Sequence, residues 1–260
     1  MINYDFSLIT FEYLLLILVR ISSFVFSAPF FGMTNTPNRV KIGFSFMVSL
    51  VLYQLVLPKD ALEYTGVIEY ATIVLKEGIT GLLIGFGANI CNSIILLSGK
   101  LIDIDIGLAM ASMFDPVNKT QSGVTGTFYN YMMLLLLIAT DMHHYILRSV
   151  IDSYQVVPIN GAVFNWEHMM STMTKYLIDM MVIGFRIMLP IFAVSLILNC
   201  VLGILAKVSP QMNMFAVGMQ LKILIGLAVM FFSAALLPSV ANFIFEEMKV
   251  MMKLFIEGMY

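Results

Sequence analysis

The chain has 260 residues, of which 60% are hydrophobic and only 12% are charged, and its formal net charge is −2. Soluble domains carry roughly 45–50% apolar and about 25% charged residues. The 14 Lys and Arg and 16 Asp and Glu of this chain are too few to cover the surface of a soluble fold of this size. The composition excludes an ordinary cytosolic enzyme, a disordered chain and a secreted disulfide scaffold, and it gives no sign of nucleic-acid binding. We therefore expect an integral membrane protein surrounded by lipid.

Six segments are apolar enough to be interpreted as membrane-crossing helices. They run over residues 8–31, 42–57, 67–97, 120–140, 178–206 and 223–245. Their apolar runs are continuous and lack the alternation of a transmembrane barrel, which predicts an all-α, polytopic fold. The third segment continues toward residues 101–106, which alternate like a strand, but the glycine spacing across them favours a helix. Pro190 lies inside the fifth segment and predicts a kink there.

The loop charges do not assign an orientation to these six segments. The loops on one side of the predicted membrane contain six Lys and Arg residues, and those on the other side contain five. Cytoplasmic loops normally contain a clear excess of Lys and Arg over the loops on the opposite side. Two explanations stay open. One of the segments is misplaced, or the chain is held inside a larger assembly instead of being threaded conventionally through lipid.

Small residues recur at helical spacing in three places. A stripe of small residues lets two helix backbones approach closely in a membrane, and a charge within it should face protein or water instead of lipid. Ordinary helix packing with a charged side chain that reaches the interface is the alternative. The three sets are Gly81 and Gly85; Gly99, Asp103 and Gly107; and Gly218, Lys222 and Gly226.

Three further charges, Arg20, Asp179 and Arg186, fall inside predicted spans. Asp179 and Arg186 share a helical face but are about 10 Å apart along the axis, so they should meet other partners than each other. Intramembrane charges mark functional or assembly sites. We expect these three residues and Lys222 to pair with neighbouring subunits or to face a lumen.

The segment that follows residue 109 differs from the membrane-crossing segments in kind. Met110, Met113 and Phe114 stand directly before Asp115 and Pro116, which initiate a turn. Irregular backbone at membrane depth is tolerated only where protein buries it or where it lines a water-filled cavity. Large, soft side chains on such a loop would be able to close a pore. The alternative interpretation is a helix C-terminus with methionines in the core.

We find no catalytic motif, and we predict no enzyme, no metal and no cofactor. His143 and His144 are adjacent, so on a helix they point about 100° apart and should not chelate one metal well. Cys91 and Cys200 lie in apolar runs and are expected to be buried thiols. A small-molecule secondary transporter is a weaker alternative, because the halves show no internal symmetry.

Several of these segments resemble the FliR family of export-gate subunits in flagellar and type III secretion systems. The start of the chain carries the family's Arg20, Pro29 and Pro37, and residues 153–158 read S-Y-Q-V-V-P, where the family has S-[FY]-x-x-[IL]-P. The most specific match is P-Q-M-N-x-F after an apolar helix. Its residues are Pro210, Gln211, Asn213 and Phe215.

The resemblance implies a non-enzymatic subunit of the flagellar export gate in the bacterial inner membrane, at the flagellar basal body. With FliP-like and FliQ-like subunits, beside FlhB-like and FlhA-like components, it would form a channel for unfolded flagellar proteins. The whole chain, 1–260, would be one gate domain, with a FliP-like part over 1–175 and a FliQ-like hairpin over 176–260. Residues 110–116 would contribute a plug, with Met110, Met113 and Phe114 as a gasket. A virulence secretion system is the alternative setting.

Overall fold

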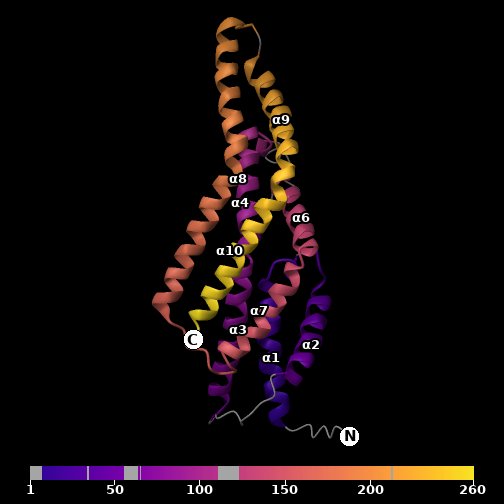
Figure 1. Ribbon diagram of the computed structural model, residues 1–260, viewed down its shortest axis with the longest axis vertical. Coiled ribbons are helices and arrows are strands. Elements are labelled where there is room, and N and C mark those ends of the chain that lie inside the picture. Colours follow the sequence, from indigo (N-terminus) through magenta and orange to yellow (C-terminus); the bar gives the residue numbers. More distant parts are fainter. Residues whose placement is uncertain (1–7, 34, 56–63, 65, 111–122, 212) are drawn as a thin grey trace. The chain divides into compact units, whose positions relative to one another are not determined.

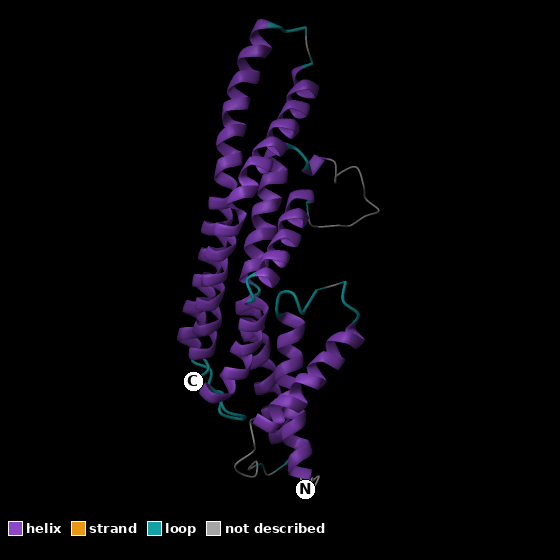
Figure 2. Cartoon of the chain, turned by 45° about the vertical axis from the view of Figure 1, so that its right-hand side comes forward, coloured by secondary structure: helices purple, strands orange, loops and turns teal. Residues whose placement is uncertain are grey.

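The computed structural model describes residues 8–33, 35–55, 64, 66–110, 123–211 and 213–260. Every regular element in these ranges is a helix, and none of the described residues forms a strand (Figure 2). The all-α, polytopic fold predicted from composition and patterning is therefore confirmed.

The helices follow one another along the chain as Figure 1 labels them. They are α1 (Leu8–Ser27), α2 (Asn38–Leu55), α3 (Val67–Ala88), α4 (Ile90–Ile106), α6 (Val124–Ala139), α7 (Met142–Val156), α8 (Trp166–Val208), α9 (Met214–Ser233), the short 3₁₀ helix η1 (Ala234–Leu236) and α10 (Leu237–Glu257). Residues 101–106 belong to α4, as the glycine spacing indicated.

The expected number of six spans is corrected by these bounds. Three stretches within the described ranges are long and apolar enough to cross a membrane, and they cover residues 10–27, 166–208 and 216–257. The number rises to five if α3 with α4, and α6 with α7, each count as one broken span. The segment predicted over 42–57 is not among them, because the polar first turn of α2 lowers its mean hydropathy. The helix α8 continues through Pro190, and the kink expected there stays a prediction.

The chain forms two compact units. The first comprises Met1–Ile90, Asp141–Tyr176 and Glu246–Tyr260, and the second comprises Cys91–Thr140 and Leu177–Phe245. Each unit draws residues from both sides of position 175, and the division into a FliP-like and a FliQ-like part stays a prediction. Cys91 is buried and Cys200 is exposed, so the expectation of two buried thiols is correct only for the former.

The core of the first unit depends on the close approach of α3 to α1. A Cβ atom added at Gly81 would collide with the backbone carbonyl of Arg20 and with Oγ of Ser23, and one added at Gly85 would lie 2.8 Å from Cβ of Ser27. Only glycine leaves room for two backbones at this separation. The small-residue stripe predicted from the sequence is thus a helix–helix contact within this chain.

Aromatic rings join α3 to α8 and α10 within the first unit. Phe86 on α3 stacks on Tyr176 with ring centroids 4.5 Å apart, and its ring meets that of Phe255 edge-on at 5.8 Å. Backbone hydrogen bonds from Val163 to Met259 and from Asn165 to Gly258 fix the end of the chain against the segment before α8. These contacts join residues that are far apart in sequence into one core.

In the second unit, as between α1 and α3, glycine leaves room for two helix backbones to pack closely. A Cβ atom at Gly99 of α4 would collide with the backbone of Gly126 in α6. The two glycines therefore allow α4 and α6 to pack in backbone contact, which brings Asp103, about one helical turn beyond Gly99, to the start of α6.

Candidate functional site

The first unit encloses a fully buried ion pair between α1 and α3. Nε of Arg20 donates to Oε2 of Glu77 across 2.5 Å, and both side chains have 0% exposure. Removing two charges from water costs several kcal/mol for each ion, and further hydrogen bonds to the pair offset part of that cost.

The surroundings of the pair supply hydrogen bonds to one further atom of each side chain, whereas Nη2 of Arg20 has no hydrogen-bond partner among the described residues. Nη1 of Arg20 donates to the carbonyl oxygen of Val157 at 2.9 Å, and the backbone N–H of Asn160 donates to Oε1 of Glu77 at 3.0 Å. The guanidinium carbon of Arg20 lies 4.2 Å from the ring centroid of Tyr154. The ion pair thus ties α1 and α3 to the end of α7 and the turn that follows it.

The expectation that Arg20 pairs with a neighbouring subunit or faces a lumen is wrong for this residue. Its partner is a carboxylate of the same chain, 57 positions away in sequence. Sequence spacing does not connect α1 with α3, so the sequence alone did not identify Glu77 as this partner.

Asp103 on α4 caps the N-terminus of α6. Both of its carboxylate oxygens accept from the backbone N–H of Thr125, at 3.2 and 3.3 Å, and only 2% of the residue is exposed. The N-cap residue of α6 is Gly123, which has no side chain that could do this. A carboxylate at a helix N-terminus satisfies an unpaired donor and opposes the positive end of the helix dipole. The predicted charge between glycines is therefore a packing element of the second unit.

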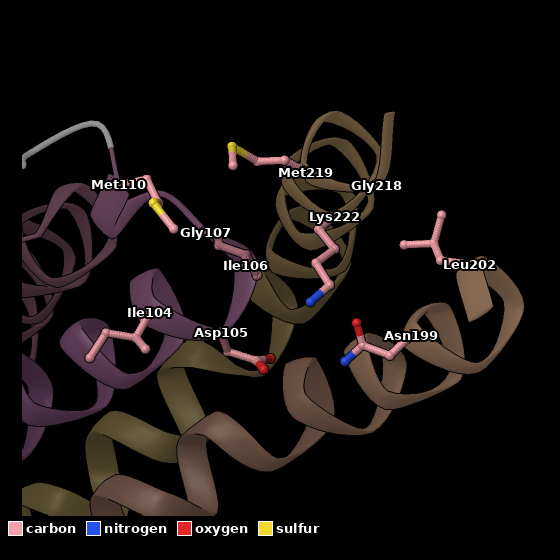
Figure 3. Close-up of a pocket in the computed structure, with 10 residues that line it drawn as sticks. All are labelled: Ile104, Asp105, Ile106, Gly107, Met110, Asn199, Leu202, Gly218, Met219 and Lys222. Atoms are coloured by element: carbon pink, nitrogen blue, oxygen red, sulfur yellow. The ribbon is translucent and has the colours of Figure 1, made fainter. Parts of the chain in front are cut away.

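A half-open cavity of about 310 Å³ lies in the second unit, between α4, α8 and α9. Figure 3 shows the amine of Lys222 pointing into the space between Asp105 and Asn199. One carboxylate oxygen of Asp105 is buried and has no hydrogen-bond partner among the described residues. The cavity therefore presents a positive and a negative side chain to the same space.

Apolar side chains form the other part of this cavity wall. Met110 and Met219 line it, and 42% of Met110 is exposed. Met110 is also the first residue of the predicted plug segment, of which residues 111–116 lie outside the described residues, so the cavity lies where that segment begins. The other plug candidates lie outside the described residues: Met113, Phe114, Asp115 and Pro116.

The two charges predicted inside α8 have different surroundings. Asp179 is half-buried, and its Oδ2 has no hydrogen-bond partner among the described residues. Arg186 is exposed, with its guanidinium carbon 5.9 Å from the ring centroid of Phe243. A charge on an otherwise apolar helix face needs a partner or water when the face is covered, and both residues stay candidates for contacts with other subunits.

The P-Q-M-N-x-F motif forms the connection between α8 and α9. Pro210 and Gln211 are exposed in the turn, and the side chain of Asn213 accepts from the backbone N–H of Ala216 at 3.4 Å, which makes it the N-cap of α9. Phe215 belongs to the first turn of α9. The motif therefore specifies a helix start with an exposed turn before it.

The profile of the family described as "Bacterial export proteins, family 1" matches residues 11–248 of the chain. The chain belongs to this family. The chain is also similar to proteins named flagellar biosynthetic protein FliR, among them one from Bacillus subtilis, which is 31% identical over 211 residues, with 80% of this chain and 81% of the relative covered. The FliR of Escherichia coli is 24% identical (87% and 84% covered), and that of Aquifex aeolicus is 25% identical (94% of each).

Membership in the bacterial export family confirms the resemblance found in the motifs, and the match extends over both compact units. The chain is a membrane component of an export apparatus. The charged residues in its apolar helices lie in three kinds of place. Arg20, Glu77 and Asp103 are buried and hold the fold together, whereas Asp105 and Lys222 line a cavity and Arg186 is exposed.

Proposed function

We propose that this chain is a non-enzymatic subunit of the flagellar export gate. With FliP-like and FliQ-like subunits, beside FlhB-like and FlhA-like components, it forms a channel for unfolded flagellar proteins across the bacterial inner membrane, at the flagellar basal body. The names of its relatives favour the flagellar system over a virulence system. The 1–175 and 176–260 division into FliP-like and FliQ-like parts belongs to the same proposal.

The observation that carries this proposal is the length of the exposed apolar surface on α8. At about 1.5 Å per residue, its 43 residues extend over about 65 Å, whereas the hydrocarbon core of a bilayer is about 30 Å thick. Only 11% of the residues in an apolar stretch of 18 residues within α8 are buried in the chain, and Trp166, Leu189 and Val208, at the start, middle and end of the helix, are all exposed. Lipid is too thin to cover such a face, so other protein subunits must cover the remainder.

Co-purification in mild detergent tests this assembly. Expressed with the FliP-like and FliQ-like proteins of its own genome, the chain should elute as one discrete complex whose mass exceeds that of any single subunit. Arg186→Leu should reduce recovery of the partners several-fold, because it removes an exposed charge from the face that they cover. Arg148→Leu is the matched control, since Arg148 pairs with Asp152 on its own helix. A monomer or dimer, with partners absent, would favour the transporter alternative instead.

A second prediction concerns the gasket of Met110, Met113 and Phe114. Flexible apolar side chains close around varied shapes at low strain, and an apolar constriction blocks ions by dewetting. Replacing all three with glycine should raise the ion conductance of the gate several-fold and slow growth of cells that express it. Replacing all three with leucine keeps the apolar volume and should preserve the seal. Unchanged conductance and growth in the glycine variant would show that these residues do not seal the channel.

A further inference from the structure

The first turn of α7 gathers three side chains that commonly bind metal ions. Asp141, His143 and His144 each offer one ligand atom, and these atoms all lie within 4.8 Å of one another. All three belong to the first compact unit. Nδ1 of His144 lies 3.2 Å from Nε2 of His143, so the two rings turn their nitrogens toward each other.

This arrangement differs from what a regular helix predicts for adjacent histidines. Neighbouring side chains on a helix point about 100° apart. For that reason, the sequence predicted that His143 and His144 do not bind one metal ion together. In the structure, the two rings are nearly perpendicular, at 78°, with centroids 4.0 Å apart. The residue before the helix, Asp141, has a φ of 56°, in the left-handed region that aspartate adopts only occasionally. The chain therefore enters α7 by a sharp turn that places a carboxylate beside both rings.

The distance between the two nitrogens matches a shared ion. Zinc binds imidazole nitrogen at about 2.0–2.1 Å in tetrahedral geometry, and two such ligands are therefore about 3.3–3.4 Å apart. A hydrogen bond from one neutral ring to the other would also account for 3.2 Å. The carboxylate next to the pair separates these two interpretations.

One polar group beside the histidine pair is not used by the fold. Aspartate at an N-cap normally accepts a hydrogen bond from the first turn, but the side chain of Asp141 makes no capping hydrogen bond. Its carboxylate offers a ligand atom within 4.8 Å of those of both rings. A hydrogen bond between the rings does not account for this carboxylate, whereas a shared ion gives it a role.

We propose that Asp141, His143 and His144 bind one divalent transition-metal ion of the zinc class. Two imidazole nitrogens and one carboxylate oxygen form the donor set, and imidazole favours zinc, nickel and copper over magnesium and calcium. The ion would hold the left-handed turn before α7 and fix the ring of His143, whose centroid lies 6.1 Å from that of Phe30 in the connection between α1 and α2. This site is independent of the proposed channel function, because it rests only on residues of this chain.

Zinc titration of the full-length protein in detergent, purified without a polyhistidine tag, tests the proposal. Isothermal calorimetry should show one Zn²⁺ per chain. His143→Gln and His144→Gln should each weaken binding at least tenfold, and Asp141→Asn should weaken it several-fold. The matched controls are His168→Gln and Cys200→Ser, which remove the remaining histidine of the chain and its exposed thiol. Both should bind zinc as the unaltered protein does.

A second readout guards against variants that simply misfold. A ligand that binds the folded state alone raises the unfolding temperature, so zinc should raise the midpoint of the unaltered protein and of His168→Gln but not that of His144→Gln. Circular dichroism and gel filtration of the zinc-free variants should match those of the unaltered protein. The absence of saturable binding below about 1 mM, or binding that His143→Gln and His144→Gln leave unchanged, would overturn the proposal.

Discussion

Replacing Glu77 with alanine is expected to lower the free energy of unfolding by about 3–5 kcal/mol, because it leaves the guanidinium of Arg20 buried without a counter-charge. Both side chains are fully enclosed, so water cannot solvate the remaining ion. The N–H of Asn160, which donates to Glu77, loses its acceptor in the same variant. Chemical or thermal unfolding of the purified chain in detergent measures the loss.

The double variant Arg20→Met with Glu77→Leu separates an unpaired charge from a loss of packing. If the charge is responsible, the double variant should be more stable than Glu77→Ala, since apolar residues of similar volume often replace a buried ion pair at little cost. Glu257→Ala is the control, because it breaks the exposed pair with Lys253, which contributes little. Equal losses in Glu77→Ala and Glu257→Ala would contradict the assignment of Arg20 and Glu77 as the centre of the first unit.

The features that the sequence predicted well are those that depend on local pattern. Continuous apolar runs are sufficient to indicate helices in a membrane, since lipid offers no partner for free backbone groups. The four-residue spacing of Gly81 and Gly85 indicated a close helix contact, and the structure places α1 against it. The start of α9 at Asn213 also has a local cause, because asparagine is a favoured N-cap, but the sequence predicted the last apolar segment only from residue 223.

The features that the sequence did not reveal depend on contacts between distant segments or on local backbone geometry. Arg20 and Glu77 are far apart in sequence, and a buried arginine indicates that an acid is needed without indicating which one. The break between α3 and α4 at Asn89 divides an apolar run that showed no proline or charge at that point. The proximity of His143 and His144 depends on the left-handed backbone of Asp141, which residue identity alone does not specify.

A large packing effect is expected at Gly81. Its added methyl group in Gly81→Ala would meet the carbonyl of Arg20 and Oγ of Ser23, so α1 and α3 must separate. Overpacking of this kind costs about 1–3 kcal/mol, and the cost here should lie at the upper end, because the obstacle is backbone and the displaced residue carries the buried ion pair. Gly78→Ala on the same helix is the matched control, since its methyl group would meet only Cγ1 of Val19, at an ordinary 3.5 Å.

The two alanine variants should therefore change stability in opposite directions. Alanine is favoured over glycine inside a helix by about 0.5–1 kcal/mol, which Gly78→Ala should gain in the unfolding measurement, whereas Gly81→Ala should lose more than that. Adding Ser23→Ala to Gly81→Ala removes one of the two obstacles and should recover only part of the loss, because the Arg20 carbonyl remains in place. If Gly81→Ala were as stable as Gly78→Ala, the two helices would not be held in backbone contact, and the position of Arg20 against Glu77 would need another cause.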